Sequence, residues 1–209
     1  MASKKTLKIV LVEPAGTINV GSVARLCENF NINELRLVSP KCDYLAKESK
    51  KMAVRGINIL EEAKIYKDLN SALSDCSRII ATCGRKDHGE IPLYSNKDAL
   101  RWALESEREE TIAIVFGRED RGLSNEELLK ANKVISLNTS DKYPSLNLSH
   151  AVAIVLHQLN QFNKLDLVKT NRKNSSPSNL ITLEDCINDL GSLLIDIGFL
   201  MKHTYKAKI

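Results

Sequence analysis

The chain has 209 residues, of which 43% are hydrophobic and 27% charged, a composition typical of a globular domain with a substantial core. It has no apolar run as long as a membrane span, no signal-peptide cleavage site, and five scattered cysteines without a C-x-x-C pair. These features disfavour a membrane protein, a disulfide framework and a zinc site, and they predict a cytoplasmic protein. The net charge of +4 is compatible with a nucleic-acid partner but is too small to demonstrate one.

Short apolar runs alternate with segments of helical pattern along the chain. The apolar runs lack the alternation of a half-exposed strand, which predicts strands that are buried on both faces. We expect strands at residues 7–13, 34–40, 65–66, 77–84, 111–117 and 133–137. We expect helices at residues 22–30, 45–55, 69–75, 96–107 and 124–131, and a further helix in the second part of 142–159. This order predicts an α/β domain with a mostly parallel sheet flanked by helices.

Four polar loops that follow expected strands are candidates for one shared site. Open α/β sheets bind ligands beyond the carboxyl ends of their strands. These loops are residues 14–21, 83–90, 117–123 and 138–147. The chain has no G-x-G-x-x-G after its first strand, no G-x-x-x-x-G-K-[ST] and no G-x-S-x-G. It must therefore bind a ligand in another way than the common nucleotide-binding folds do.

The C-terminal part differs in composition from the rest. Residues 163–179 lose apolar periodicity and are rich in Asn, Ser and Lys, which predicts a linker. Residues 180–203 predict an amphipathic helix with Thr182 as its N-cap. We therefore expect a main domain at 1–162, a linker at 163–179 and a helical extension at 180–209, whose apolar face needs a partner.

Residues 142–159 change from a polar loop to a long apolar helix. Ser145, Asn147 and Ser149 stand at the change, and such side chains cap helices by accepting backbone N–H bonds. The helix that follows is apolar on nearly all sides, so we expect it to be buried. Its polar start could hold a ligand, or it could simply be the cap of a core helix.

The loop between the expected strand 7–13 and the expected helix 22–30 carries Gly16, Asn19 and Gly21. Arg25 follows within that helix. Asn19 or Ser22 could cap a helix there, and exposed amides beside a guanidinium would make an anion site. A capped helix with a surface arginine is the simpler alternative.

Gly117 and Gly122 bracket four charged residues at the end of an apolar strand. Glycines let the backbone approach a ligand closely, which makes a merely solvated turn less attractive. Glu119 could pair with Arg25, or it could hold a ribose or an amine. His88 is better explained as an exposed loop residue than as a general base, and His150 and His157 lack a third ligand, so we predict no metal site.

Three motifs in order resemble those of the SpoU-type RNA 2′-O-ribose methyltransferases of the SPOUT superfamily. They are N-x-G-x-x-A-R from Asn19 to Arg25, I-V-F-G-x-E-x-x-G-L from Ile114 to Leu123, and I-S-L-N-T followed by S-L-N-L-S-x-A-V-A from Ile135 to Ala153. The segments around Thr82–Arg85, Tyr143 and Ile197–Leu200 most resemble the TrmJ-like tRNA methyltransferases. The resemblance covers about residues 7–160.

The resemblance implies a deep trefoil knot, a homodimer with its active site at the subunit interface, and S-adenosyl-L-methionine as the cofactor. The implied cofactor-binding residues are Thr82, Cys83, Gly84, Gly117, Leu137, Ser145, Leu146 and Asn147. The implied catalytic residues are Arg25, Asn19, Glu119, Ser145 and Asn147. Arg25 has been proposed as the base in this family, but a guanidinium is effectively always protonated. We therefore expect Arg25 to bind a phosphate and to stabilise developing oxyanion charge.

The resemblance also implies an RNA substrate methylated on a ribose 2′-OH, most simply a cytidine or uridine in the tRNA anticodon loop. We expect basic residues to contact phosphates and an aromatic residue to stack on an unpaired base. The candidate RNA-binding residues are Arg25, Lys51, Arg55, Arg85, Lys86 and Tyr143. Alternatives are methylation of rRNA, a non-catalytic RNA-binding dimer of the same fold, and an ordinary flavodoxin-like nucleotide-binding domain.

Overall fold

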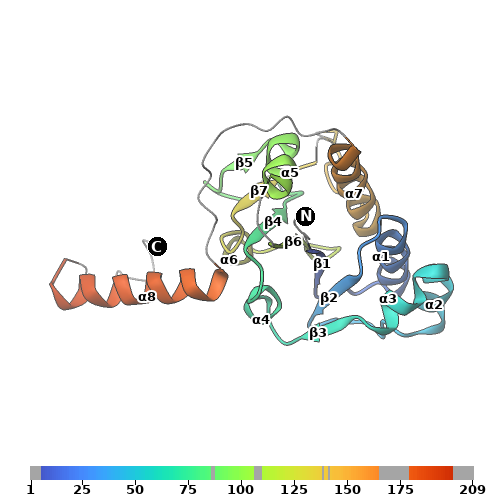
Figure 1. The fold of residues 1–209 in the computed structure, drawn as a ribbon, viewed down its shortest axis with the longest axis horizontal. Coiled ribbons are helices and arrows are strands. Elements are labelled where there is room, and N and C mark those ends of the chain that lie inside the picture. Colours follow the sequence, from blue (N-terminus) through green and yellow to red (C-terminus); the bar gives the residue numbers. More distant parts are fainter. Residues whose placement is uncertain are drawn as a thin grey trace, which may run out of the picture.

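A seven-stranded parallel sheet forms the centre of the protein, in the order β3-β2-β1-β6-β4-β7-β5 (Figure 1). This computed structural model describes residues 6–85, 88–105, 110–137, 139–140, 142–164 and 179–199. The strands are β1 (Thr6–Val12), β2 (Glu34–Val38), β3 (Lys64–Tyr66), β4 (Arg78–Thr82), β5 (Leu93–Tyr94), β6 (Thr111–Phe116) and β7 (Lys133–Ile135). The predicted parallel α/β class is confirmed. The two-residue strand β5, at the sheet edge, was missed.

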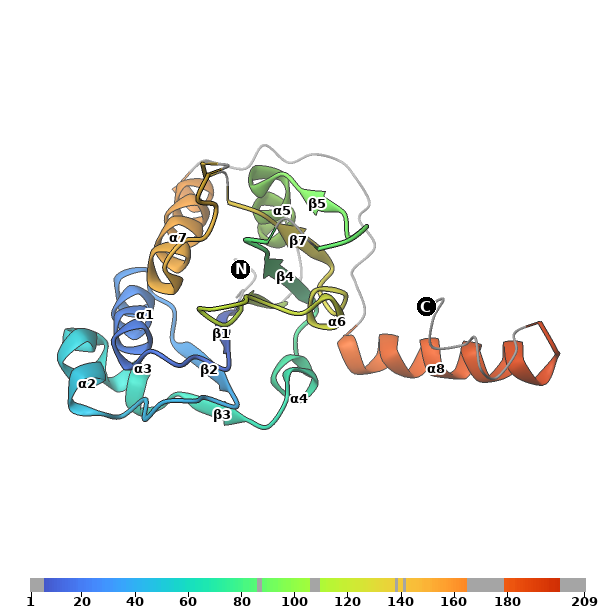
Figure 2. The same ribbon diagram turned by 180° about the vertical axis from the view of Figure 1, so that it is seen from behind.

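Helices cover both faces of the sheet (Figures 1 and 2). They are α1 (Thr17–Asn29), α2 (Lys47–Ala53), α3 (Ile57–Glu61), α4 (Leu69–Leu73), α5 (Asn96–Leu104), α6 (Asn125–Leu128), α7 (Leu148–Lys164) and α8 (Leu180–Asp196), with the 3-10 turn η1 (Val54–Gly56). Alternate residues of β1 enter different cores: Ile9 and Leu11 face α1, α3, α5 and α7, whereas Val10 and Val12 face α4 and α6. Burial on both faces is why the strand sequences show no polar alternation.

Helix α1 begins at Thr17, five residues before the predicted start, so the expected loop 14–21 is largely helical. Its N-cap is Gly16 without a side-chain cap, and neither Asn19 nor Ser22 serves as the cap. Gly21 is inside the helix because α2 packs on it: a Cβ there would lie 2.2 Å from the Ser49 carbonyl oxygen. The glycine therefore marks a close helix contact and not a loop.

Helix α7 starts where predicted, and the Asn147 side-chain oxygen accepts from the backbone N–H groups of Ser149 (2.9 Å) and His150 (3.4 Å). Val152, Val155, Leu156 and Leu159 are buried, but the opposite side of the helix is exposed. Within this chain the predicted burial of α7 is therefore confirmed for one side of the helix and not for the opposite side.

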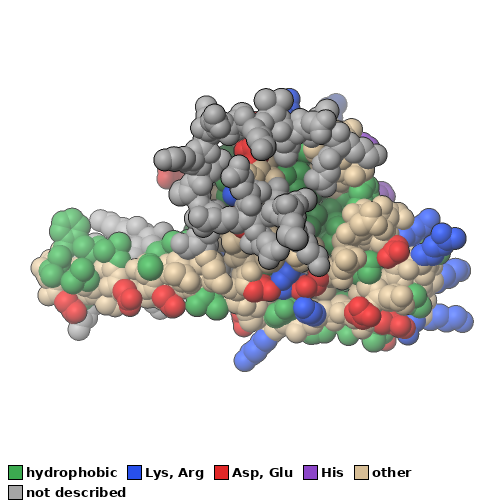
Figure 3. All heavy atoms as spheres, viewed as in Figure 1, with side chains coloured by type: hydrophobic (Ala, Val, Ile, Leu, Met, Phe, Trp, Pro, Cys, Tyr) green, Lys and Arg blue, Asp and Glu red, His purple; other side chains and the backbone are tan. Residues whose placement is uncertain are grey.

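Helix α8 extends away from the domain, and hydrophobic side chains gather at its far end (Figures 1 and 3). Its N-cap is Asn179 and not Thr182, and it ends at Asp196 because Gly198 takes a left-handed conformation (φ 75°) that terminates the helix. The N-terminal part of α8 is held against the domain by Glu184, whose carboxylate lies 3.3 Å from Lys130 Nζ and 3.2 Å from Asn70 Nδ2. Most of the predicted linker lies outside the described residues, where 165–178 fall. No helix in the described ranges is both long and apolar enough to cross a membrane.

Candidate functional site

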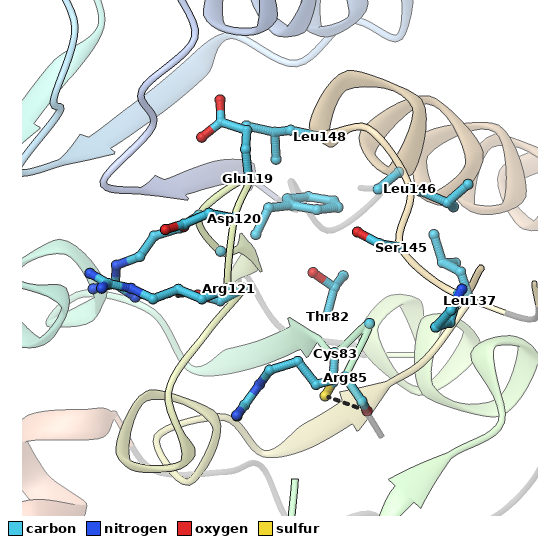
Figure 4. A pocket seen from close by; sticks show the side chains of 17 residues that line it. Thr82, Cys83, Arg85, Glu119, Asp120, Arg121, Leu137, Ser145, Leu146 and Leu148 are labelled. Carbon is cyan, nitrogen blue, oxygen red and sulfur yellow. Dashed lines mark hydrogen bonds between the residues drawn. The ribbon is translucent and has the colours of Figure 1, made fainter. Parts of the chain in front are cut away.

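A cavity of about 240 Å³ lies at the carboxyl ends of β4, β6 and β7 (Figure 4). Its lining comes from three segments that are far apart in the sequence: 82–85 after β4, 116–122 after β6, and 137 with 144–151 after β7. The predicted cofactor residues Thr82, Cys83, Gly84, Gly117, Leu137, Ser145 and Leu146 all line it. The structure thus brings together residues from three of the four loops that the sequence predicted to share one site, whereas no residue of 14–21 lines the cavity.

Apolar side chains from β6, from the segment after β7 and from α7, together with charged residues at 85 and 118–121, make up much of this lining. Phe116, Leu137, Leu146, Leu148 and Ala151 contribute apolar surface. The segment after β4 is fixed in place by two hydrogen bonds, from the Cys83 amide to the Ile135 carbonyl (2.8 Å) and from the Thr82 hydroxyl to the Val115 carbonyl (3.1 Å). A pocket with an apolar wall and a few fixed polar groups is suited to a small organic ligand.

Three predicted site residues form a hydrogen-bonded relay beside the cavity. Asn19 Nδ2 donates to Glu119 Oε1 (3.0 Å), and Asn147 Nδ2 donates to Asn19 Oδ1 (3.0 Å). Because Asn147 also caps α7, the relay joins α1, the loop after β6 and the lip of the cavity. Asn19 and Asn147 do not themselves line the cavity.

The Glu119 carboxylate points away from the cavity (Figure 4) and is the anion at the start of α1. It accepts from the backbone N–H groups of Ala15 (3.1 Å) and Gly16 (3.0 Å) as well as from Asn19. Burial raises the pKa of Glu119, but these hydrogen bonds outweigh it and hold the pKa below its usual value. The amides that the sequence suggested for a ligand anion are therefore already occupied by Glu119.

The expected pairing of Arg25 with Glu119 is not present among the ion pairs of the described residues. Because α1 starts at Thr17, Arg25 lies in its third turn and not at its N-terminus. Its side chain is exposed, and it does not line the cavity of its own chain.

The candidate RNA-binding residues lie in two places. Lys51 and Arg55 are exposed on α2 and η1, which pack against α1 near Arg25. Arg85 lines the cavity and donates to Asn125 Oδ1 (2.7 Å), and Tyr143 is 78% exposed before α7. Lys86 lies outside the described residues. In the part of the chain that the structure describes, no group of His, Cys, Asp or Glu side chains could hold a metal ion.

Sequence reasoning missed the arginine between Gly117 and Glu119. Arg118 binds Glu13 at the end of β1 and Glu127 on α6, with both partners within 3.0 Å. The only sequence signal was the cluster of opposite charges in 118–127. That cluster was interpreted as a ligand site or a solvated turn, because nothing in the sequence places Glu13 nearby.

A cavity of this kind defines an α/β protein that binds a small ligand beyond the carboxyl ends of parallel strands. Comparison with known proteins then gives its family. A family model described as "SpoU rRNA Methylase family" matches residues 6–157. The chain belongs to this family of methyltransferases, as its motifs indicated.

Relatives with assigned names agree with this membership. The chain is 40% identical over 157 residues to a tRNA (cytidine-2′-O-)-methyltransferase TrmJ of Methanocaldococcus jannaschii, covering 73% of this chain and 66% of that protein. It is 37% identical over 169 residues to the Sulfolobus acidocaldarius protein of the same name, covering 79% and 70%. The crystal structure of TrmJ from Z. mobilis is similar, with a TM-score of 0.78, 26% identity, and coverage of 94% and 83%. The chain thus spans about two thirds of the length of these archaeal relatives.

Proposed function

We propose that this protein transfers a methyl group from S-adenosyl-L-methionine to a ribose 2′-OH of RNA, with tRNA as the preferred substrate over rRNA. The observation that carries the proposal is the single cavity lined by the second and third family motifs and by the loop after β4. The names of the relatives, tRNA 2′-O-methyltransferases, favour tRNA and a pyrimidine target. More specifically, we propose that the methylated nucleotide is a cytidine or uridine in the tRNA anticodon loop.

The residues of the cavity fit S-adenosyl-L-methionine. Its volume of about 240 Å³ is close to the lower limit of ~300 Å³ for small-molecule pockets. Phe116, Leu137 and Leu146 offer apolar surface for an adenine, while the backbone at 82–84 and at Gly117 offers polar groups for the rest. When bound, this cofactor supplies an electrophilic methyl group on a sulfonium. Ser145 and Leu146 would hold it at the lip, and the relay through Asn147 would fix that lip.

Methyl transfer to a hydroxyl needs the oxygen, carbon and sulfur in line, so the protein acts mainly by positioning. A guanidinium is a poor general base, so we do not assign Arg25 to proton abstraction. We assign it to bind the phosphate next to the target ribose and to stabilise the negative charge that develops on the 2′-oxygen. Asn19 and Glu119 act indirectly, by positioning other groups, because their side chains are hydrogen-bonded within the relay.

We propose a homodimer in which Arg25 of one copy serves the cavity of the other. Arg25 does not line its own chain's cavity, which supports an active site shared between subunits. Ile18 on α1 and Ile154 on α7 are 54% and 39% exposed, and their helices pack side by side. An Ile18→Glu protein should become monomeric by light scattering; a wild-type monomer would contradict the proposal.

We further propose that the chain is knotted. β7 pairs with β4 and β5, yet α7 packs on α1, the helix that connects β1 to β2, and both of these strands lie beyond β4 and β6 in the sheet order. The segment between β7 and α7 therefore crosses back over the carboxyl ends of these strands, beside the loop after β6. A crystal structure in which this segment passes outside that loop would contradict the knot.

RNA would reach the site over the basic surface of Lys51 and Arg55, with Arg85 at the cavity and Tyr143 stacking on a base, and Lys86 stays a candidate for a phosphate contact. We also propose that the protein acts in the cytoplasm, as we expect of an enzyme that modifies tRNA. The test uses purified protein with S-adenosyl-L-methionine and unmodified tRNA or rRNA, followed by nucleoside mass spectrometry.

We expect 2′-O-methylated pyrimidine in tRNA, and we expect Arg25→Ala to lose at least 100-fold in rate while still binding cofactor by calorimetry. Lys64→Ala, on the distant strand β3, is the charge-matched control. Cofactor binding without methylation of either RNA would favour a non-catalytic binding protein, and no cofactor binding would overturn the proposal.

A further inference from the structure

We infer that Arg118 is a positioning residue for the reaction: it sets the shape of the loop 117–122, and through Glu119 it sets the position of the cavity lip. This inference rests on the proposed function, because its effect is read through cofactor binding and methylation. Arg118 touches neither Asn19 nor Asn147 in the hydrogen bonds of the described residues. Its influence on the relay must therefore pass through the loop, although Arg118 is itself one of the residues that line the cavity.

The Arg118 guanidinium is held from two sides. Nε donates to Glu13 Oε2 (2.9 Å), while Nη1 and Nη2 donate to the two carboxylate oxygens of Glu127 (2.8 and 3.0 Å). Only 13% of the side chain is exposed. A forked, bidentate pair of this kind fixes direction as well as distance, which a lysine cannot do.

Both carboxylates are themselves fixed. Glu13 has a left-handed backbone (φ 45°), a conformation that a non-glycine residue keeps only when its surroundings require it. Glu127 belongs to the capping box of α6, where it also accepts from the Ser124 amide (2.7 Å). Arg118 therefore ties the loop to the end of β1 and to the start of α6.

The loop closes on itself around Arg118. The Gly122 amide donates to the Arg118 carbonyl (3.0 Å), and Arg118 Nη1 donates to the Gly122 carbonyl (3.3 Å). Gly122 has a left-handed φ of 67° that allows the tight turn. Glu119 lies inside this closed turn, so the direction of its carboxylate depends on the shape of the turn.

Besides the ion pairs of Arg118, the turn is held by the hydrogen bonds that Glu119 accepts from Ala15, Gly16 and Asn19. Residues 118–121 line the cofactor cavity on one side and a second hollow of about 300 Å³ on the other, which Glu13, Ala15 and Lys41 complete. A thin wall between two hollows lacks a core on either side. We infer that the ion pairs of Arg118 set the shape of the turn together with the hydrogen bonds that Glu119 accepts, and that the relay Glu119–Asn19–Asn147 carries that shape to the lip.

A purely stabilising ion pair is the alternative, and the chain offers a matched control. Arg36 on β2 is also buried and forked between two carboxylates, Glu34 (2.6 Å) and Asp75 (2.7 Å), but it lies away from the cavity. Arg118→Lys and Arg36→Lys both keep the charge and lose the fork. If stability alone matters, both variants will lose activity to the same degree as they lose thermal stability.

The experiment measures the dissociation constant for S-adenosyl-L-methionine by calorimetry, steady-state methylation of tRNA, and the unfolding midpoint for both variants. We expect Arg118→Lys to weaken cofactor binding at least tenfold and to lower kcat/KM further, whereas Arg36→Lys lowers only the unfolding midpoint. Arg118→Lys is also measured in an Asn147→Ala protein. This comparison distinguishes an effect of Arg118 that passes through the relay from a local effect on the cavity. In the Asn147→Ala protein, the loss caused by Arg118→Lys should shrink at least threefold, because the relay is already broken.

Equal kinetic losses in the two lysine variants, or full additivity with Asn147→Ala, would overturn the inference. If Arg118→Lys does not fold, Glu13→Gln replaces it, since this change removes one ion pair and keeps an acceptor oxygen. The proposed function fails differently: in that case the wild-type protein itself shows neither cofactor binding nor methylation.

Discussion

Asn19 uses both ends of its side-chain amide, donating to Glu119 and accepting from Asn147. A carboxylate could not donate to Glu119, and a hydroxyl is too short to reach both partners from one position. The amide is therefore the group that joins the loop after β6 to the lip before α7. This explains why an asparagine in α1 matters to a cavity that it does not line.

Replacing Asn19 tests this relay at the level of one residue. Asn19→Ala removes a hydrogen bond to a charged group, so we expect it to lower the free energy of unfolding by about 1.5–3 kcal/mol. Asn19→Asp should cost more, because it places a second carboxylate 3.0 Å from Glu119 Oε1. Urea unfolding of both variants at neutral pH checks the order, and an aspartate variant as stable as wild type would contradict it.

The acidic residues around Arg118 predict a pH dependence of stability. Hydrogen bonding to Arg118 lowers the pKa of Glu13, and at Glu127 burial raises the pKa but the bonds from Arg118 and Ser124 outweigh it. Their stabilising effect is complete above the unfolded glutamate pKa of ~4.3 and is lost as the pH falls through the lower folded values. The free energy of unfolding should therefore fall on acidification below about pH 4.5.

Arg118→Met is the comparison for this pH dependence. It returns both glutamates toward their ordinary pKa, so the decrease in stability between about pH 5 and pH 3 should be shallower than in wild type. Denaturant titrations at several pH values measure both slopes. Parallel slopes for the two proteins would show that the ion pairs of Arg118 with Glu13 and Glu127 do not determine the loss of stability at acidic pH.

At the level of residues, the sequence motifs named side chains that lie together in the structure, but ion-pair partners far apart in the sequence were missed. Asn19, Glu119 and Asn147 were predicted and lie together, but their roles in a relay were not. Arg118 was missed because its partner Glu13 is 105 residues away and no local pattern connects the two. Charge clusters in a sequence show that ion pairs are available and do not show which ones form.

At the level of elements, two glycines fix α2 and η1 against α1. A Cβ on Gly21 would lie 2.2 Å from the Ser49 carbonyl oxygen, and one on Gly56 would lie 2.4 Å from the Ala24 carbonyl oxygen. Ser49 is fully buried and donates to the Thr17 carbonyl (2.7 Å). The basic residues of α2 and η1 are thereby held at a constant distance from Arg25.

Gly21→Ala should disrupt this contact. The clash is with backbone atoms, so α2 must shift, and we expect the free energy of unfolding to fall by about 1–3 kcal/mol or more. Gly84→Ala is the control for stability, because a Cβ there meets nothing within 4 Å. Thermal and urea unfolding compare the two, and equal losses would contradict the packing role of Gly21.

The same glycine shows why the start of α1 was mispredicted. In a sequence, a glycine inside a helical pattern can indicate either a loop or a close contact with another element. The outcome depends on Ser49, which lies 28 positions further on and whose proximity only the fold reveals. Strands were predicted more reliably because burial on both faces leaves a continuous apolar run.

At the scale of the whole molecule, α8 is attached to the domain mainly at its base. Glu184 contacts Lys130 and Asn70, and Asn179 binds the Ser74 carbonyl, while large apolar side chains such as Leu190 (56%) and Leu193 (55%) remain exposed. The division into a main domain and a helical extension stays a prediction. It can be tested directly by truncation.

A protein ending at residue 178 should keep its fold and its cofactor affinity. Few contacts join α8 to the sheet domain, so we expect the unfolding midpoint to change by about 5 °C or less. Circular dichroism melting and cofactor calorimetry measure both properties. Cooperative unfolding lost on truncation would show that α8 belongs to the core of the domain.

The order of strands could not be obtained from the sequence. Periodicity predicts which segments are strands and that they run parallel, but not that β6 and β4 lie between β1 and β7. That order places the loops after β4, β6 and β7 around one cavity. The resemblance to the family implies a knot, which general rules of chain connection would have argued against, and the knot stays a prediction.

The hydrogen bond between Asn19 and Asn147 joins residues 128 positions apart. At synthesis rates of ~5–20 residues per second, the ribosome adds Asn147 roughly 6–26 s after Asn19. During this interval the nascent chain can form β1, α1 and β2, but it cannot yet close the cavity. The cavity is thus among the last features to mature, and a chain that stalls before α7 emerges would be a folding intermediate without affinity for the proposed cofactor.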